Sequence, residues 1–270
     1  MFASHNVCAV LQSPHMNSFG VAESLHGKVA VITGASRGIG EAIARAFVAE
    51  GAKVVLAARK IDALEKVATS LGENAFAVAA HTGKEEDCEK LVAAAVTKFG
   101  KVDVLVNNAA ANPYFGPMLG IEMPAWDKTF EVNVKGYFYM TRAVVRHLAG
   151  RSAPGSIIHV ASVAGLLASP LQGVYGMTKA AILSMTKTLS VELAGSKIRV
   201  NAIAPGFVET KFAGAVLQNP ELLAKVNERT PLGRPGVPDE IAGGAVYLAS
   251  DASSYLTGHT LVIDGGMTVS

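Results

Sequence analysis

A tyrosine and a lysine stand four residues apart in Tyr175-Gly-Met-Thr-Lys179, where a loop is expected to run into a long helix. Residues i and i+4 of a helix share a face, so the phenol and the ammonium point the same way. A nearby positive charge stabilises a phenolate and lowers the tyrosine pKa toward the working pH, which makes a general acid/base. Such pairs also arise by chance on solvated helix faces, so the meaning of this one depends on the surrounding elements.

The composition suits parallel strands that are covered by helices on both faces, because 50% of the 270 residues are hydrophobic and only 6% are aromatic. The formal charge is +2 and the basic residues are scattered, which argues against binding to nucleic acid or to a membrane surface. No segment is long enough and apolar enough for a membrane span. We therefore expect a protein that acts on a small-molecule partner.

The two cysteines, Cys8 and Cys88, fit no zinc or disulfide spacing and indicate free thiols in a reducing compartment. The seven histidines form no metal-ligand pair at helical spacing, so we predict no metal site. Residues 1–26 contain no Lys or Arg, and their longest apolar run, Val7–Leu11, is too short for a signal peptide. We predict a poorly ordered N-terminal arm over 1–26 and a cytoplasmic protein.

Strand and helix patterns alternate from residue 27 to residue 270 without a linker or repeat. The predicted strands are 28–33, 52–58, 75–80, 102–106, 156–160, 198–203 and 260–263. The predicted helices include 62–71, 85–99, 124–149, 174–193 and 238–250, with a mixed segment over 207–229. This order predicts one domain, an α/β fold with a doubly wound, Rossmann-type parallel sheet of about seven strands and helices on both faces. Such sheets bind ligands at the carboxyl ends of their strands.

A glycine loop, Thr33-Gly-Ala-Ser-Arg-Gly-Ile-Gly40, lies between the first strand and the first helix. Gly34 allows a tight turn, Gly38 lets the backbone approach a pyrophosphate, and Gly40 allows close packing of helix and strand. The helix N-terminus adds free N–H groups for phosphates. The loop predicts a dinucleotide site, with a purely structural turn as the alternative. The cofactor contacts expected from this loop are Gly34, Ser36, Arg37, Gly38, Ile39 and Gly40.

The end of the second strand indicates which nucleotide binds. An NAD site usually has an acidic residue there, but this strand ends in Ala58 and is followed by Arg59. Arg59, helped by Arg37, could pair with the 2′-phosphate of NADP(H). We therefore predict NADP(H), with NAD(H) possible. The alternative is that Arg59 and Lys60 are ordinary surface cations.

With the glycine loop and the Tyr175–Lys179 pair in one chain, the sequence resembles the short-chain dehydrogenase/reductase family from residue 27 to the C-terminus. Asn107-Asn-Ala-Ala110 is similar to the Asn-Asn-Ala-Gly segment of the family, with Ala110 in place of the usual glycine. The resemblance implies a catalytic set of Asn133, Ser162, Tyr175 and Lys179. It also implies further cofactor contacts from His81, Asn108, Tyr175, Lys179, Pro205, Gly206, Val208 and Thr210.

Two stretches, 81–87 and 108–116, resemble the NADPH-dependent carbonyl/retinal reductase branch of this family. His81 stands where many relatives have an Asp that contacts adenine. The family usually forms homotetramers, so a homotetramer is expected and a homodimer is an alternative. The aromatic residues Tyr137, Phe138 and Tyr139 are interpreted as helix packing.

The resemblance also implies the roles of the catalytic residues. Ser162 and Tyr175 would bind the substrate oxygen, and Tyr175 would donate the proton while hydride moves to carbon. Lys179 would lower the pKa of Tyr175 and hold the nicotinamide ribose, and Asn133 would anchor a water chain.

The substrate pocket is expected to contain mostly apolar groups, with no evident Lys or Arg clamp for an anion. Its predicted lining is Asn112, Tyr114, Leu166, Phe207 and Phe212, with residues 207–231 as a lid. This lining favours neutral lipophilic or aromatic ketones and aldehydes. The alternatives are a 3-oxoacyl-(acyl carrier) reductase, an NAD-dependent alcohol dehydrogenase of the same family, and a cofactor-binding protein without turnover.

Overall fold

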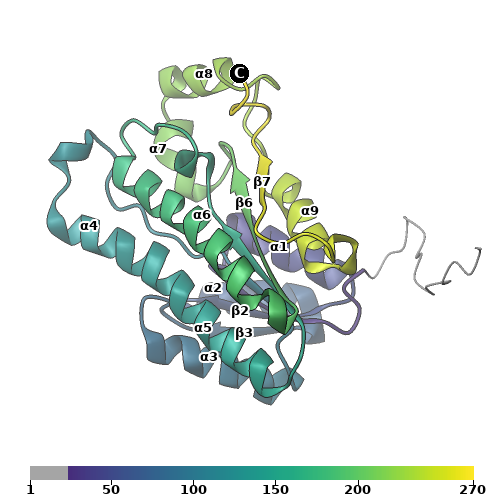
Figure 1. Ribbon diagram of the computed structural model, residues 1–270. Helices are drawn as coiled ribbons and strands as arrows, with labels where there is room; N and C mark the ends of the chain where they lie inside the picture. Colours follow the sequence, from purple (N-terminus) through teal and green to yellow (C-terminus); the bar gives the residue numbers. More distant parts are fainter. Residues whose placement is uncertain (1–23) are drawn as a thin grey trace, which may run out of the picture.

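The computed structural model describes residues 24–270, whose strands form one seven-stranded sheet in the order β3-β2-β1-β4-β5-β6-β7 (Figure 1). All six strand pairs are parallel. The strands are β1 (Val29–Thr33), β2 (Lys53–Ala58), β3 (Ala75–Ala79), β4 (Val104–Asn107), β5 (Gly155–Val160), β6 (Ile198–Pro205) and β7 (Thr260–Ile263). The predicted Rossmann-type sheet is confirmed. The residues before Ser24, Cys8 among them, lie outside the described part of the chain.

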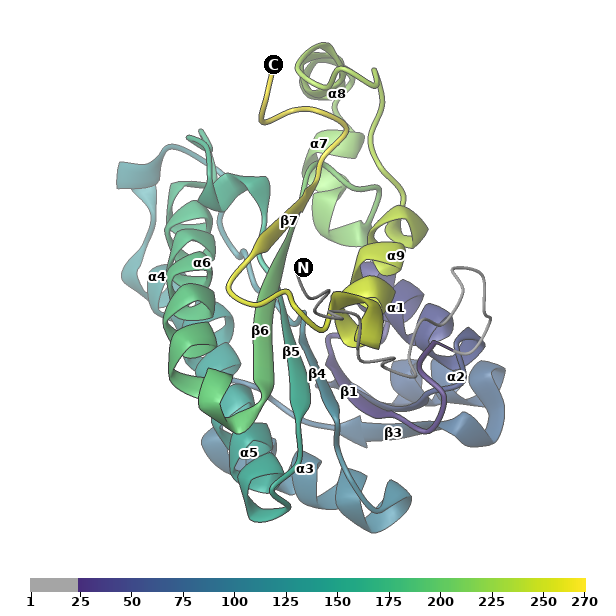
Figure 2. The same cartoon turned by 45° about the vertical axis from the view of Figure 1, so that its right-hand side comes forward.

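Helices cover both faces of the sheet, as Figure 2 shows. One layer contains α1 (Gly38–Ala49), α2 (Ile61–Leu71) and α9 (Pro238–Ala249), and the other contains α3 (Glu85–Phe99), α4 (Met123–Phe130), α5 (Gly136–Gly150) and α6 (Gly173–Leu193). Side chains of a strand point alternately to its two faces. Ile32 accordingly joins the core beneath α1 and α9, while its neighbour Val31 joins the core beneath α3 and α5. The free thiol Cys88 lies in this second core, where burial raises its pKa to about 12.

The helix predicted over 124–149 is interrupted by a π-helical turn, Glu131–Lys135, between α4 and α5. Asn133 lies in the middle of this turn and is fully buried. Single π turns inside α-helices are frequent at functional sites. Hydrophobic periodicity gives no sign of one extra residue in a turn, so the sequence predicted a continuous helix.

A long connection between β6 and β7 extends beyond the carboxyl ends of the strands (Figure 1). It contains a 3₁₀ turn at Lys211–Ala213 and the short helices α7 (Gly214–Leu217) and α8 (Pro220–Glu228). Asn219 caps α8, since its side-chain oxygen accepts hydrogen bonds from the N–H groups of Glu221 and Leu222. This connection contains the predicted lid, residues 207–231.

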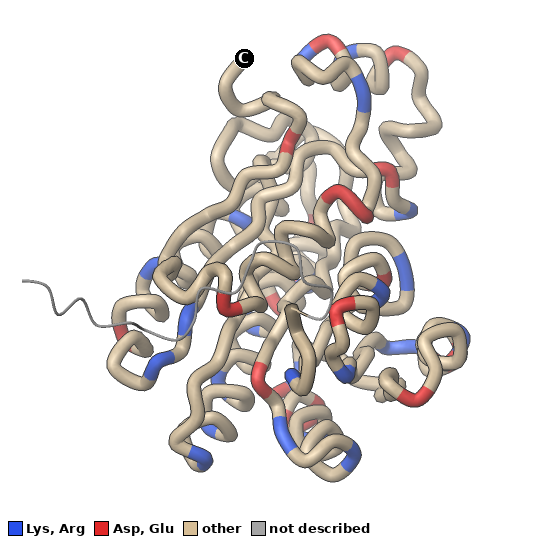
Figure 3. Tube along the Cα trace, turned by 90° about the vertical axis from the view of Figure 1, so that its right-hand side faces the viewer, with Lys and Arg blue, Asp and Glu red and all other residues tan. Residues whose placement is uncertain are grey.

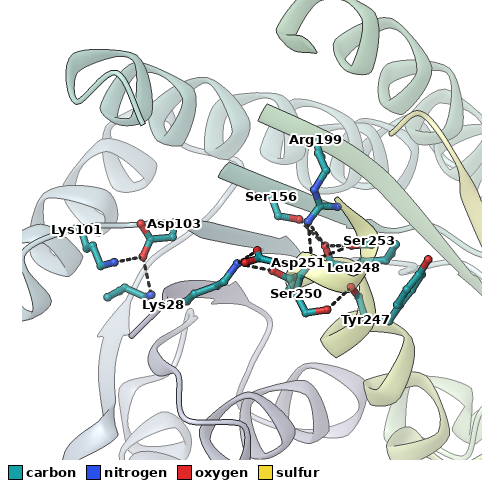
Figure 4. A network of polar contacts seen from close by, with 12 residues as sticks. Lys28, Lys101, Asp103, Ser156, Arg199, Tyr247, Leu248, Ser250, Asp251 and Ser253 are labelled. Carbon is teal, nitrogen blue, oxygen red and sulfur yellow. Dashed lines mark hydrogen bonds and ion pairs between the residues drawn. The ribbon is translucent and has the colours of Figure 1, made fainter. Parts of the chain in front are cut away.

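At the amino ends of the strands, away from the cavity end, polar contacts join the sheet to the end of α9 (Figure 4). Arg199 at the start of β6 donates to the backbone oxygens of Leu248 and Ser250, and Lys28 pairs with Asp251 at 2.8 Å. This network holds α9 against the sheet. The distinctive polar residues of the sequence lie at the carboxyl ends of the strands instead.

Along the Cα trace in Figure 3, basic and acidic residues are interspersed. Within residues 24–270, no helix is long and apolar enough to cross a membrane. The same residues contain no group of three or more His, Cys, Asp or Glu side chains that could hold a metal ion.

Candidate active site

The carboxyl ends of β1, β2, β4, β5 and β6 open onto one cavity of about 870 Å³. One side, here called the floor, is formed by the residues that follow these strands together with Tyr175 and Lys179 of α6. Residues 207–231, the segment predicted to be a lid and here called the lid, line the rest of the cavity together with neighbouring loops. The floor and the lid differ in how their side chains are held.

The glycine loop is held against the end of β4 by buried hydrogen bonds. The Thr33 hydroxyl accepts from the N–H groups of Asn108 at 2.9 Å and Ala109 at 3.1 Å, and the Asn108 amide donates to the Thr33 oxygen at 2.9 Å. A side chain at position 40 would collide with the Gly34 carbonyl, which fits the predicted role of Gly40 in close packing. Gly38 has a φ of 58°, and the Thr210 methyl group closely faces it. The loop backbone and the start of α1 are thus brought to the cavity.

Asn133 links the loop after β4 to α6. Its side chain accepts from the Ala111 N–H at 2.8 Å, and it donates to the Ala111 oxygen at 3.0 Å and to the Thr178 hydroxyl at 3.0 Å. Thr178 in turn donates to the Tyr175 backbone oxygen at 2.7 Å. One buried amide therefore fixes the helical turn that contains Tyr175. Asn133 itself lies behind the cavity wall rather than in it.

Lys179 is buried beneath Tyr175, with 1% of its surface exposed. Its ammonium donates to the Val160 oxygen at 2.7 Å and to the Tyr137 hydroxyl at 3.3 Å, and Tyr137 donates to the same Val160 oxygen at 2.9 Å. The Lys179 nitrogen lies 5.5 Å from the centre of the Tyr175 ring. Ser162 follows β5 on the cavity wall, where its hydroxyl accepts from the Ala164 N–H at 3.1 Å.

Burial controls the protonation of this pair. Removal from water lowers the pKa of Lys179 to about 7. It also raises the pKa of Tyr175 above its ordinary value, and a hydrogen bond with the Ser162 hydroxyl opposes that rise. The result differs from the predicted lowering of the Tyr175 pKa. The reason is that desolvation of the ring is the largest influence, while the ammonium hydrogen-bonds to Val160 and Tyr137.

The structure brings nearly all the predicted nucleotide contacts to the cavity. Those that line it are Gly34, Ser36, Arg37, Gly38, Ile39, Arg59, His81, Asn108, Tyr175, Lys179, Pro205, Gly206, Val208 and Thr210. Gly40 lies behind the lining. The His81 ring accepts from the Gly83 N–H at 3.1 Å and lies 2.9 Å from the Lys128 nitrogen.

The predicted substrate contacts are only partly brought together. Asn112, Phe207 and Phe212 line the cavity, and Phe212 packs against Tyr175 with ring centres 5.6 Å apart. Tyr114 does not line it, because its hydroxyl turns back to donate to the Pro117 oxygen. Leu166 also points elsewhere and is 46% exposed.

Sequence reasoning missed several lining residues. The loop before Tyr175 and the helix α8 provide Leu167, Pro170, Leu171, Gln172, Leu222, Lys225, Val226 and Arg229, and Phe115 and Met267 also contribute. The spacing of 222, 225, 226 and 229 is that of one helix face and could have indicated an inward stripe. No Lys or Arg clamp was evident from the sequence, but Lys225 and Arg229 line the cavity, as does Lys211 next to Thr210.

A family model described as enoyl-(acyl carrier protein) reductase matches residues 34–268. The dehydrogenase/reductase SDR family member 4 of Homo sapiens is 41% identical over 247 residues, which are 90% of this chain and 88% of that protein. The chain belongs to the short-chain dehydrogenase/reductase family. The predicted family is thereby confirmed.

Solved structures of this family superpose on the chain. A 3-ketoacyl-(acyl-carrier-protein) reductase from Brucella melitensis, complexed with NADH, is 39% identical with a TM-score of 0.85 and covers 91% of this chain and 100% of its own. A gluconate 5-dehydrogenase from Burkholderia cenocepacia, in complex with NADP and tartrate, is 32% identical with a TM-score of 0.88, covering 92% and 98%. Short-chain dehydrogenases of this fold therefore include enzymes seen with either nucleotide. The chain is an oxidoreductase of this family.

Proposed function

We propose that this short-chain dehydrogenase transfers a hydride between NADP(H) and a ketone or aldehyde, or the corresponding alcohol. The observation that carries the proposal is the convergence of Ser162, Tyr175 and Lys179 on one wall of a cavity whose other end is the glycine loop. A hydroxyl pair beside a buried amine is a proton-transfer arrangement. The glycine loop, with Arg37 and Arg59 in the same cavity lining, supports a dinucleotide site.

The residues around the glycine loop fit an NADP(H) cofactor. Gly38 has a positive φ and lies at the first residue of α1, where a helix N-terminus would bind a pyrophosphate, and the Thr210 methyl group packs against this turn. Arg37 and Arg59 line the end expected to hold a 2′-phosphate, and none of the described residues that line the cavity is Asp or Glu. When bound, the cofactor supplies or accepts the hydride. Pro205, Gly206 and Thr210 would hold its carboxamide end, and Lys179 its ribose.

The side chains of the floor would handle the proton. The Ser162 and Tyr175 hydroxyls would donate hydrogen bonds to the substrate oxygen, and Tyr175 would release its proton as negative charge develops there. Lys179 in its ammonium form favours the resulting phenolate, because opposite charges attract at this distance. Asn133 holds the Tyr175 turn in place through Thr178, and its position beside the Ala111 oxygen supports the expected path for a replacement proton.

Replacement of Tyr175 by Phe tests the reaction. The change removes one hydroxyl and keeps the ring, so NADPH should still bind, whereas NADPH oxidation should fall by about 10²–10⁴-fold. Activity is followed by the absorbance of NADPH with ketones, aldehydes and 3-oxoacyl thioesters. Unchanged turnover in the variant would remove Tyr175 from the chemistry. Bound NADPH without turnover in the wild type would favour the cofactor-binding alternative.

The preference for NADP(H) is tested at Arg59. Arg59→Asp replaces a cation by a carboxylate, which would repel a 2′-phosphate and accept the ribose hydroxyls of NADH. We expect NADPH affinity to fall by at least about tenfold, because a charge-assisted hydrogen bond contributes about 1.5–3 kcal/mol, while NADH affinity stays or rises. The neighbouring change Lys60→Gln is the control. Equal catalytic efficiency of the wild type with NADH and NADPH, or unchanged NADPH affinity in Arg59→Asp, would refute the preference.

Reduction of a 3-oxoacyl group on an acyl carrier is the second candidate. The similarity to the Brucella melitensis reductase supports it, since that protein is 39% identical and covers 91% of this chain. The discriminating measurement is the ratio of kcat/KM for a 3-oxoacyl thioester to that for a simple ketone of equal chain length. A ratio near one favours a general carbonyl reductase.

We also propose a homotetramer in the cytoplasm. Exposed apolar side chains on α5 and α6, among them Phe138, Met177 and Val191, support an interface between copies on this layer. Light scattering that reports a monomer would contradict the assembly, and a dimer would limit it to one interface.

A further inference from the structure

All the charged side chains that line the cavity are cationic. They are Arg37, Arg59, Lys60, Lys179, Lys211, Lys225 and Arg229. Among residues 24–270, no carboxylate lines it, although the whole chain has 22 acidic residues against 24 basic ones. Arg37, Arg59 and Lys60 belong to the nucleotide end, and Lys179 to the floor. The remaining three lie on the lid and have no part in the reaction described above.

Two of the lid cations belong to one face of α8 and its C-terminal cap. Leu222, Lys225, Val226 and Arg229 line the cavity, with the i, i+3, i+4, i+7 spacing of a single helix face. The acidic residues of this helix, Glu221 and Glu228, are exposed and do not line the cavity. Lys225 and Arg229 are exposed as well, but they border the cavity together with Leu222 and Val226, whereas the two carboxylates lie outside its lining.

The two cations are left without ion pairs in the part of the chain that the structure describes. Glu221 precedes Lys225 by four residues, a spacing that favours a pair on a helix. The ion pairs of the neighbouring segments lie elsewhere, such as Arg234–Glu240. Lys225 and Arg229 are also four residues apart, so their like charges destabilise α8 by a few tenths of a kcal/mol. An anion between them would remove that repulsion.

The nucleotide does not account for these charges. Arg59 follows β2 and the lid follows β6, which is four strands away in the sheet, so the two strand ends are roughly 19 Å apart. The phosphates of a dinucleotide would lie at the glycine loop and Arg59. Lys211 is next to Thr210, which faces Gly38 of the glycine loop, so we assign Lys211 to the nucleotide end of the cavity. Lys225 and Arg229 remain for the substrate.

We infer that Lys225 and Arg229 select carbonyl substrates with an apolar body and an anionic end, a carboxylate or a phosphate. This inference rests on the proposed carbonyl reduction and names its substrate class. Leu222, Val226 and Phe212 contact the apolar body, with the reacting carbonyl at Ser162 and Tyr175 and the anion beneath α8. The predicted neutral substrate rested on the absence of such cations.

Three methyl ketones with the same eight-carbon chain form the test: 7-oxooctanoate, its methyl ester and 2-octanone. They share the reacting group and differ in charge at the far end. We expect the wild type to show kcat/KM for 7-oxooctanoate about tenfold above the ester and the ketone, because two partly exposed ion pairs contribute about 0.2–1 kcal/mol each. In Lys225→Gln/Arg229→Gln the ratio of acid to ketone should fall toward one. In the control Glu221→Gln/Glu228→Gln the ratio should persist. Equal rates for acid and ketone in the wild type, or a ratio unchanged in the lid variant, would overturn the inference.

Calorimetric titration separates this result from a failure of the proposed reaction. Octanoate, octyl phosphate and 1-octanol are titrated into the full chain in the presence of NADP⁺. Tighter binding of either anion than of the alcohol, weakened about tenfold in the lid variant, supports the inference even if none of the ketones is reduced. The tighter of the two anions identifies carboxylate or phosphate. Equal binding of all three overturns it, and reduction of neutral ketones then leaves the proposed reaction intact.

Discussion

The floor and the lid of the cavity are built on opposite principles. The polar side chains that position the floor are buried and hydrogen-bonded: Asn133, behind the cavity wall, contacts Ala111 and Thr178, and Lys179 contacts Val160 and Tyr137. In the lid, Val208, Val216 and Thr230 are buried, but Phe212 is 50% exposed and Lys225 and Arg229 are exposed as well. Geometry is therefore fixed on one side and left adjustable on the other.

This difference separates the reaction from the choice of substrate. A proton-transfer site must hold its groups within fractions of an ångström, which a buried hydrogen-bonded network achieves at the cost of removing polar and charged groups from water. A substrate-binding side gains from exposed groups that can change without disturbing the core. The largest effects on stability should thus arise in the floor and the smallest in the lid.

Asn133→Ala should be the most damaging of the substitutions considered. It removes one acceptor and one amide donor, leaving the Ala111 N–H, the Ala111 oxygen and the Thr178 hydroxyl short of a partner. Each buried polar group left unsatisfied costs about 1–3 kcal/mol, so we expect a loss of about 3 kcal/mol in the free energy of unfolding by urea, with loss of turnover. Asn112→Ala is the matched control, because Asn112 is a half-buried asparagine in the loop after β4, next to Ala111. Equal losses in the two variants would show that burial of the Asn133 amide is not what fixes the floor.

Lys179→Met should have the opposite effect on stability. Burial holds the folded-state pKa of Lys179 at about 7, below its ordinary value of 10.5. Below pH 7 the lysine is charged in both states, and the folded state bears the full cost of burying that charge. Between pH 7 and 10.5 the unfolded state binds more protons, so wild-type stability rises with pH.

We therefore expect Lys179→Met to be more stable than the wild type by about 1–3 kcal/mol at pH 6, although inactive. The gain should shrink above pH 7 and vanish near pH 10.5. Thermal unfolding across this pH range measures it, with Lys187→Met, at an exposed position of α6, as the control. A gain that does not change with pH would show that the buried ammonium is not the source of the difference. A stabilised but inactive variant would identify Lys179 as a residue kept for function at a cost in stability.

Sequence patterns could predict the floor far better than the lid. The glycine loop and the ends of β4, β5 and β6 have local signatures, and a parallel sheet brings the carboxyl ends of its strands to one edge. Tyr137 had no such signature: it was interpreted as helix packing, yet its hydroxyl lies 3.3 Å from the Lys179 nitrogen. That contact depends on the register of α5 after the π turn at Glu131–Lys135, which periodicity does not indicate. The spacing of 222, 225, 226 and 229 marks one face of α8, but it does not indicate that this face borders the cavity, because that depends on how residues 207–231 fold relative to the sheet.

Phe212→Ala should have the smallest effect on stability and still change catalysis. The ring is half exposed, so its loss should cost less than about 1 kcal/mol in unfolding free energy. It also packs against Tyr175 with ring centres 5.6 Å apart, and an aromatic pair contributes about 0.5–1.5 kcal/mol. We expect kcat/KM to fall about 2- to 10-fold, mainly through KM because Phe212 contacts the apolar body of the substrate. Phe212→Leu, which keeps an apolar group, should recover most of the loss. If Phe212→Ala destabilised the fold as much as Asn133→Ala, the lid would be part of the same rigid unit as the floor, and the separation of reaction from substrate choice would fail.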